Sequence, residues 1–447
     1  MEGRARHARV GVLIESNEKR GAPTIRERHL TQSVPAEKAL LVGVASGPQA
    51  RLETESSVEE LGALARSAGA QVVGSIVQER KRKDPATLIG RGKVEEVART
   101  AEAKSVDLLL FDEELSPAQQ RNLERGIGRK TLDRTQLILD IFARRARSRE
   151  GRLQVELAQL DYMLPRLTGK GALMSRLGGG IGTRGPGETK LETDRRRIRQ
   201  RIQSVRREIE KVRRNRTTRR EARQRAQAPV VALVGYTNAG KSTLFTALTR
   251  AETQVSDQLF MTLDPLVRKA DFGPGREVLL VDTVGFIQKL PHALVAAFRA
   301  TLEEVTAADL LLHVIDASAE DMQEREAAVE SVLREIGAAD RPRVQVLNKI
   351  DLVPPARGAG LKAARPDAVL VSARGGEGLD ELAATLSRRL ALVPQRVRLC
   401  FSSHDARGIA GVYAAGRVVA HEVRGDEVTL EADIPERLLA RYREHLR

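Results

Sequence analysis

The sequence has almost no cysteine and no long apolar run, and both absences restrict the class of protein. Cys400 is the only cysteine among 447 residues, so no internal disulfide can form. No stretch approaches the roughly 18 to 20 uninterrupted apolar residues of a membrane-spanning helix, and the first residues lack the pattern of a secretory signal. Apolar residues at 41% and charged residues at 30% are typical of a soluble globular chain. We therefore expect a cytoplasmic protein, with peripheral association with a membrane left open.

The positive charge of the chain is concentrated in one segment. The whole chain has 75 Lys and Arg against 60 Asp and Glu, and residues 130–226 contain 27 of the basic and 11 of the acidic residues, a net charge of +16. Because like charges repel, such a concentration is expected where a polyanionic partner neutralises it. The segment therefore predicts binding to nucleic acid, and a solvated charged helix is the alternative.

The pattern of apolar residues divides the remainder of the chain. Short apolar runs alternate with helical periodicity over residues 38–133, which predicts a small parallel α/β domain, and over residues 228–394, which predicts a larger doubly wound domain. Residues 395–447 contain three strand patterns and a helical pattern from Glu436 to His445, and predict a small α+β module. Residues 1–37 mix charge with Gly and Pro and predict a poorly ordered extension.

Between the two α/β domains, residues 134–226 show helical periodicity alone. Leucines spaced by four, three and four residues from Leu153, and a second apolar series from Ile198, are the seams of two helices packed along each other. The segment 175–190 between them is rich in glycine and contains proline, which helix interiors disfavour. We predict a basic helical hairpin with a glycine-rich loop at its tip. The side chains expected to contact RNA are Arg184, Arg195, Arg196, Arg197, Arg199 and Arg201.

The most specific motif is GYTNAGKS at residues 235–242, which matches the phosphate-binding pattern GxxxxGK(S/T) and follows a predicted buried strand. Backbone N–H groups in such a loop point at phosphate oxygens, and the helix N-terminus adds partial positive charge. We expect Lys241 to reach the β and γ phosphates and Ser242 to bind Mg²⁺. The predicted contacts are Gly235, Tyr236, Thr237, Asn238, Ala239, Gly240, Lys241, Ser242 and Thr243.

Three further motifs follow in the order that a GTPase requires. DTVG ends a strand, and places Asp282 near Mg²⁺ and the Gly285 N–H near the γ-phosphate. NKID supplies Asp351, whose carboxylate is expected to accept from the N1–H and the 2-amino group of guanine. Adenine lacks this pair of donors, so ATP would leave the carboxylate unpaired. A Ser-Ala-Arg sequence after a later strand is expected to contact guanine O6. The remaining predicted contacts are Asn348, Lys349, Ser372, Ala373 and Arg374.

Two positions near these motifs concern hydrolysis. Thr262 is the predicted second hydroxyl ligand of Mg²⁺ and reader of the γ-phosphate, although Thr253 falls in the same interval. Phe286 stands where Ras-like enzymes place the glutamine that orients the attacking water, so we expect slow intrinsic hydrolysis unless a partner completes the site. Asn238 either holds a monovalent cation such as K⁺ against the phosphates or stabilises the loop. The predicted catalytic residues are Lys241, Thr262, Gly285 and Asn238.

Five stretches carry a resemblance to a known family: IGRGKVEE (89–96), DEELSPAQQRNLE (112–124), residues 132–167, the GGGIGTRGPGET loop and GYTNAGKSTLF (235–245). In them the chain resembles the HflX family of translational GTPases, and other GTPases have no counterpart of the middle stretches. The resemblance implies a bacterial-type cytoplasmic factor that binds the large ribosomal subunit near the peptidyl-transferase centre and separates stalled or idle ribosomes under stress, with an N-terminal domain linked to ATP. The chain departs from the family at Lys190, around Met261 and at Leu266 and Val267.

The sequence therefore predicts a multidomain α/β protein, monomeric, that binds GTP and GDP with Mg²⁺ and hydrolyses GTP. Its basic hairpin is expected to dock on ribosomal RNA under control of the nucleotide. Two alternatives stay open: a non-ribosomal RNA-binding GTPase that acts in RNA modification or ribosome assembly, and a binding module in which the nucleotide is structural.

Overall fold

The computed structural model separates Met1–Ala36 from one unit, Glu37–Arg447. The predicted extension at residues 1–37 lies almost entirely outside the residues that the structure describes. These are 36–167, 186–225, 228–250, 259–260, 262–273, 276–289 and 302–447.

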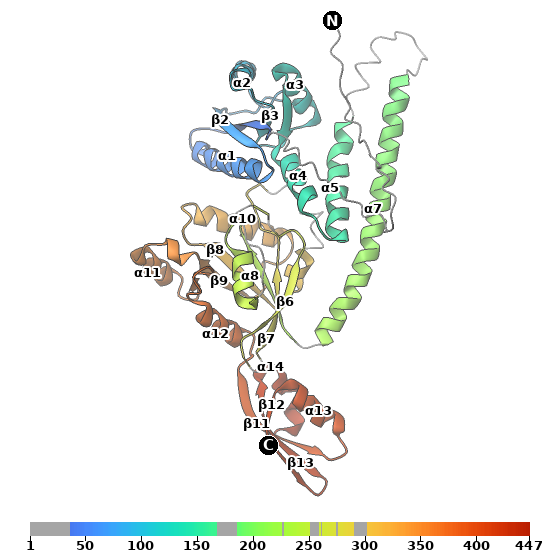
Figure 1. The fold of residues 1–447 in the computed structure, drawn as a ribbon, viewed down its shortest axis with the longest axis vertical. Helices are drawn as coiled ribbons and strands as arrows, with labels where there is room; N and C mark the ends of the chain where they lie inside the picture. Colours follow the sequence, from blue (N-terminus) through green and yellow to red (C-terminus); the bar gives the residue numbers. More distant parts are fainter. Residues whose placement is uncertain are drawn as a thin grey trace, which may run out of the picture. The chain divides into compact units, whose positions relative to one another are not determined.

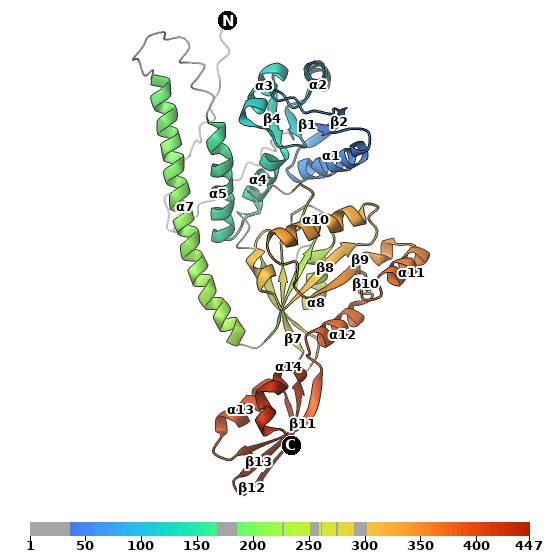
Figure 2. The same ribbon diagram turned by 180° about the vertical axis from the view of Figure 1, so that it is seen from behind.

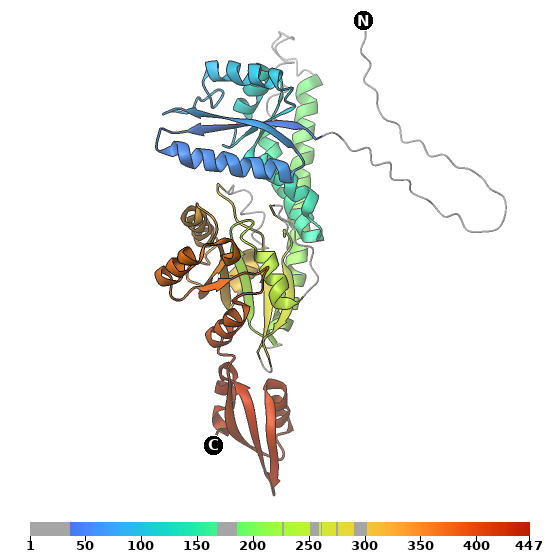
Figure 3. The same ribbon diagram turned by 60° about the vertical axis from the view of Figure 1, so that its left-hand side comes forward.

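The first domain is a parallel sheet with helices on both faces (Figures 1 and 3). Its elements are β1 (Lys38–Ala45), α1 (Ala50–Ser67), β2 (Gln71–Glu79), α2 (Arg91–Ala103), β3 (Leu108–Phe111), α3 (Pro117–Ile127) and β4 (Lys130–Asp133). The strand order is β2-β1-β3-β4, with every neighbouring pair parallel. Successive side chains of a strand alternate between faces. Leu41 therefore packs with α1, whereas Leu40 packs with α2 and α3. The predicted parallel α/β class is confirmed, and β4 is an addition.

The basic segment forms helices α4 (Arg134–Arg145), α5 (Arg149–Arg166) and α7 (Pro186–Arg225). Helices α5 and α7 lie side by side (Figure 2), and Arg201 bonds Glu156 across them at 2.6 and 2.9 Å. This confirms the predicted hairpin. Helix α7 begins at Pro186, inside the range predicted as loop, because proline is tolerated in the first turn of a helix. Residues 168–185 of the predicted tip lie outside the described residues.

Helix α5 has a second apolar face that the leucine spacing did not indicate. Val155, Ala158 and Tyr162 are buried in the apolar cluster that also contains residues of α1 and α4. The Tyr162 hydroxyl donates to Asp133 Oδ2 at 2.8 Å. The hairpin is thus attached to the first domain along one face of α5.

The third region is a six-stranded sheet covered on both faces. Its elements are β5 (Val230–Gly235), α8 (Lys241–Thr249), β6 (Leu266–Asp271), β7 (Glu277–Asp282), β8 (Leu310–Asp316), α10 (Met322–Glu335), β9 (Arg343–Asn348), a 3₁₀ turn (Ile350–Leu352), α11 (Pro355–Ala364), β10 (Val369–Val371) and α12 (Leu379–Arg389). The order is β10-β9-β8-β5-β7-β6, and only β6 is antiparallel to its neighbour. After β5 the chain forms β6 and β7 on one side of β5 within the sheet, and then β8, β9 and β10 on the other side. This is the arrangement that opens a ligand crevice at the carboxyl ends of the strands.

The C-terminal module is a three-stranded antiparallel sheet in the order β11-β13-β12. Its elements are β11 (Pro394–Ser402), α13 (Ala406–Ala415), β12 (Arg417–Arg424), β13 (Glu427–Pro435), α14 (Glu436–Leu439) and a 3₁₀ helix (Ala440–His445). The predicted C-terminal helix is therefore α14 continued as 3₁₀, and α13 is an addition. Throughout the described residues, no helix combines the length and the hydropathy needed to cross a membrane.

Candidate nucleotide site

Two glycines shape the loop between β5 and α8. Gly235 and Gly240 have φ of +152° and +89°, a region of backbone conformation that favours glycine. A Cβ at Gly235 would overlap the Val314 carbonyl oxygen, and one at Gly240 would overlap the Asn348 side chain. The loop leads directly into the first turn of α8, whose N–H groups lack intrahelical partners. These free donors and the helix dipole make the loop a binding site for an anion.

Lys241 is buried at the start of α8. Its Nζ donates to the carbonyl oxygens of Gly235 at 3.0 Å and Tyr236 at 2.7 Å. Burial lowers the pKa of Lys241 to about 8. A phosphate beside this ammonium would favour its charged form, because an opposite charge nearby offsets the loss of water.

The three predicted metal ligands lie together. Ser242 Oγ donates to Asp282 Oδ2 at 2.8 Å, the Thr262 hydroxyl donates to the same oxygen at 2.7 Å, and the two hydroxyls are 3.0 Å apart. Asp282 Oδ1 is buried and has no hydrogen-bond partner within the described part of the chain, and burial raises the pKa of Asp282. A carboxylate oxygen without a partner, next to two hydroxyls, fits a hard cation such as Mg²⁺. The alternative, Thr253, lies outside the described residues.

The DTVG segment packs directly on the phosphate loop. Thr237 N donates to the Phe286 carbonyl at 2.7 Å, and Phe286 N donates to the Gly235 carbonyl at 3.1 Å. A Cβ at Gly285 would crowd Thr237 and Lys241. Phe286 is 1% exposed and belongs to the apolar cluster that includes Tyr236. The phenyl ring at this position therefore fills the core.

Asn348 connects two segments that the sequence predicts as separate motifs. Its Nδ2 donates to the Ala239 carbonyl at 2.9 Å, and its Oδ1 accepts from Ala373 N at 3.0 Å. Lys349 has φ of +63° and its ammonium pairs with Asp316 at 2.7 Å. The phosphate loop and the predicted guanine loop are thereby held at one end of the sheet. Of the other predicted contacts, Thr243 is half-buried, Ser372 is buried, and Asp351 and Arg374 are exposed.

Asn238 lies in the phosphate loop with its side chain exposed and with φ of +59°, which asparagine tolerates better than most residues. Its role in holding K⁺ stays a prediction.

A buried polar network that sequence reasoning missed joins the site to the first domain. Arg134 is 2% exposed and bonds Asp112 at 2.6 and 3.0 Å, Glu60 at 2.7 Å and the Gln288 carbonyl at 3.4 Å. The Tyr236 hydroxyl donates to Glu60 and accepts from Gln288 N at 2.8 Å. These partners are far apart in sequence, so no local pattern indicates the network. The phosphate loop and the segment after DTVG therefore both contact the first domain.

The predicted RNA-contacting arginines divide into three groups. Arg196, Arg197 and Arg199 are exposed on α7. Arg195 is half-buried, and Arg201 is bonded to Glu156 within the hairpin. Arg184 lies outside the described residues. Arg197 also pairs with Asp194 on the same helix at 4.0 Å. These three exposed arginines are therefore the described part of the prediction that solvent, and hence a polyanion, can reach.

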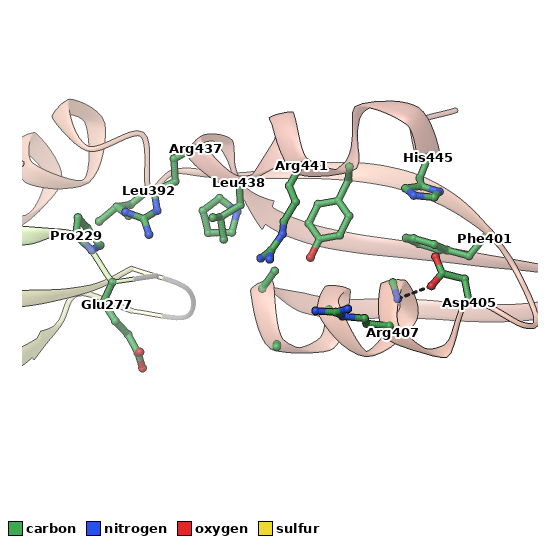
Figure 4. A pocket seen from close by; sticks show the side chains of 17 residues that line it. Pro229, Glu277, Leu392, Phe401, Asp405, Arg407, Arg437, Leu438, Arg441 and His445 are labelled. Carbon is green, nitrogen blue, oxygen red and sulfur yellow. Dashed lines mark hydrogen bonds between the residues drawn. The ribbon is translucent and has the colours of Figure 1, made fainter. Parts of the chain in front are cut away.

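A cavity of about 620 Å³ borders the C-terminal module, and Figure 4 shows Phe401, Arg407 and Arg441 among its lining residues. No residue of the nucleotide motifs lines it. It is separate from the site built around Lys241.

Comparison with known proteins identifies the family. Three family models match in chain order: a GTP-binding GTPase N-terminal region (55–143), a GTP-binding GTPase middle region (145–223) and a 50S ribosome-binding GTPase (230–349). GTPase HflX of Caldanaerobacter subterraneus subsp. tengcongensis is 48% identical over 398 residues, 89% of this chain and 91% of that protein. The chain belongs to the HflX family of GTPases. Its nucleotide site is therefore that of a GTP-hydrolysing enzyme, in which Mg²⁺ accompanies the nucleotide.

Other HflX proteins and a solved structure are also similar to this chain. GTPase HflX of Escherichia coli (strain K12) is 48% identical over 336 residues, 75% of this chain and 79% of that protein. The crystal structure of a GTP-binding protein from the archaeon Sulfolobus solfataricus in complex with GDP is 26% identical with a TM-score of 0.41. That match covers 79% of this chain and 98% of the archaeal one.

Proposed function

We propose that this HflX-family GTPase docks on the large ribosomal subunit through its basic hairpin when GTP is bound, and separates stalled or idle ribosomes into subunits. The observation that carries the proposal is the row of exposed arginines Arg196, Arg197 and Arg199 on a hairpin joined to a GTPase domain. The match of residues 230–349 to a model described as a 50S ribosome-binding GTPase supports the choice of partner.

The geometry of the nucleotide site supports a role for each of the following groups. Lys241 and the N–H groups of the phosphate loop would bind the β and γ phosphates, and Ser242, Thr262 and Asp282, which lie in mutual contact, would hold Mg²⁺. When bound, Mg²⁺ neutralises charge on the phosphates. The Gly285 N–H contacts the γ-phosphate.

In this proposal the chain supplies side chains that bind the guanine base, but the residue after DTVG does not orient the attacking water. Asp351, together with the loop from Ser372 to Arg374, binds guanine. The Phe286 side chain lies in the core and supplies no hydrogen bond to the attacking water. Hydrolysis is therefore slow until the ribosome completes the site.

The hairpin binds RNA by charge. Each contact between an arginine and a phosphate releases counterions, so the logarithm of affinity falls by about 0.7 to 0.9 per contact for each unit of log salt concentration. Arg196 and Arg199 are three residues apart on α7, so their side chains lie on one face of the helix. This face is the one we expect to meet ribosomal RNA.

The test compares two double variants that remove equal charge. Arg196→Gln with Arg199→Gln changes the hairpin, and Arg388→Gln with Arg389→Gln changes the exposed end of α12. Subunit separation is followed by light scattering and ribosome binding by sedimentation over a range of salt concentrations. We expect the hairpin variant to bind more weakly, with a salt slope smaller by about 1.4 to 1.8 if both arginines contact phosphate, and to split ribosomes more slowly. GTP binding should be unchanged.

Equal loss in both double variants would contradict a role specific to the hairpin. Binding to free RNA without binding to ribosomes would favour the alternative, a GTPase that acts in RNA modification or ribosome assembly.

A further inference from the structure

Asp264 connects the segment that contains Thr262 to the start of the hairpin. Its Oδ2 accepts from Arg147 N at 3.0 Å and from Ser148 N at 2.7 Å, and its Oδ1 accepts from the Ser148 hydroxyl. Ser148 is the N-cap of α5, and its Oγ accepts from Gly151 N at 2.8 Å. The Asp264 carboxylate therefore holds Ser148, the residue that caps α5, in place.

The first turn of α5 is shaped to admit this carboxylate. A Cβ added to Gly151 would overlap Asp264 Oδ1. Glycine is a poorer helix former than alanine, and the close approach of Asp264 supplies a packing reason for glycine at this position. The negative charge also lies at the positive end of an 18-residue helix, where it is favourable.

Two further contacts fasten the same segment to the first domain and α4. Leu259 N donates to the Ser67 hydroxyl at 3.1 Å. The Phe260 ring packs edge-to-face on Phe142 of α4, with ring centroids 4.7 Å apart. The described residues on both sides of Met261 thus contact elements outside the GTPase sheet.

We propose that Asp264 transmits the nucleotide state from Thr262 to the N-terminus of α5, and through α5 to the hairpin. The inference rests on the proposed function, because it takes Thr262 as the residue that reads the γ-phosphate.

The physical basis is the short connection between the two residues. Thr262 and Asp264 are two positions apart, and a chain segment of that length spans at most about 7 Å when extended. A large displacement of Thr262 from Ser242 and Asp282 therefore moves Asp264 as well. Hydrogen bonds weaken within a few tenths of an ångström of their optimum. Release of Thr262 therefore breaks the contact with Ser148 and leaves the cap of α5 without its support.

Hydrogen exchange of the full chain, with a non-hydrolysable GTP analogue and with GDP, tests the link. In the parent protein we expect the amides of Arg147 and Ser148 to exchange about fivefold faster with GDP, the factor that a helix cap is worth. Asp264→Ala and Gly151→Ala should both remove this difference, although alanine is the better helix former at 151. Gly92→Ala is the matched control, since a Cβ at this helical glycine meets nothing within 4 Å.

Several outcomes would overturn the proposal. One is equal exchange of Arg147 and Ser148 with the two nucleotides in the parent protein, and another is a Gly151→Ala variant that keeps the nucleotide difference. Sedimentation with ribosomes separates this question from the proposed function. A parent protein that shows the exchange difference but never binds ribosomes would contradict the proposed function and support the link.

Discussion

At the scale of the residue, our proposal makes the choice of base depend on Asp351 and on the support that Asn348 gives to its surroundings. Asn348 bonds the Ala239 carbonyl and Ala373 N at once, so the phosphate loop and the loop after β10 are held in one arrangement. Asp351 is the exposed middle residue of the 3₁₀ turn that follows β9. A carboxylate in this place is available to accept from the guanine edge.

Asp351→Asn should weaken GTP binding by at least about tenfold, or 1.4 kcal/mol, because an amide nitrogen replaces one acceptor of the carboxylate. Xanthosine triphosphate should gain affinity, since its 2-oxo group accepts from that amide. Titration with both nucleotides measures the change, and Asp380→Asn, an exposed position on α12, is the control. An Asp351→Asn variant that binds GTP as tightly as the parent would contradict the role of Asp351 in binding guanine.

Residues whose role is fixed by backbone geometry or by a compact motif are predictable from sequence. Gly235, Gly240 and Lys241 follow from the phosphate-loop pattern, and the structure shows the close approaches that require the glycines. Phe286 shows the limit of such reasoning. The sequence indicates that it cannot orient water, but its burial beside Tyr236 depends on packing between segments distant in the chain.

At the scale of the element, β8 carries a buried histidine to which our proposal gives no role in the reaction. His313 is 1% exposed in the middle of the sheet, and its Nδ1 has no partner among the described residues. Burial lowers the pKa of His313 to about 3. The folded protein therefore keeps this ring neutral at a pH where the unfolded chain is protonated.

This shift predicts a loss of stability in acid. The unfolded chain binds a proton below about pH 6.5 and the folded chain does not until about pH 3, so the free energy of unfolding decreases as the pH falls through this window. Between about pH 7.5 and 5.5 the parent should lose roughly 1.4 kcal/mol more than His313→Leu. Denaturant unfolding at the two pH values gives the difference, with the exposed His404→Gln as the control. Parallel pH dependences in the parent and His313→Leu would refute this account.

The elements that periodicity marks strongly are predictable, and those that depend on tertiary contacts are not. The leucine series from Leu153 predicts the hairpin, and the structure confirms the paired helices α5 and α7. The opposite face of α5 is not predictable from the sequence, because Val155, Ala158 and Tyr162 are interspersed with polar residues. Helix α13 is not predictable in the same way, because its sequence, ARGIAGVYAA, is rich in glycine and alanine and lacks a clear apolar stripe.

At the scale of the whole molecule, the nucleotide site contacts the other regions at two places. Arg134, Glu60 and Gln288 join the first domain to the segment after DTVG. Asp264 joins the segment around Thr262 to Ser148 at the start of the hairpin. In our proposal the DTVG segment and the segment around Thr262 sense the γ-phosphate. Each of them is therefore adjacent to a contact with a residue outside the GTPase sheet. This arrangement is the basis for expecting the nucleotide to control docking of the hairpin.

The most direct test of that claim is sedimentation of the full-length protein with large ribosomal subunits, once with a non-hydrolysable GTP analogue and once with GDP. The account predicts that the protein pellets with the subunits in the presence of the analogue, and does so much less with GDP. Equal pelleting with the two nucleotides, or none with either, would contradict it.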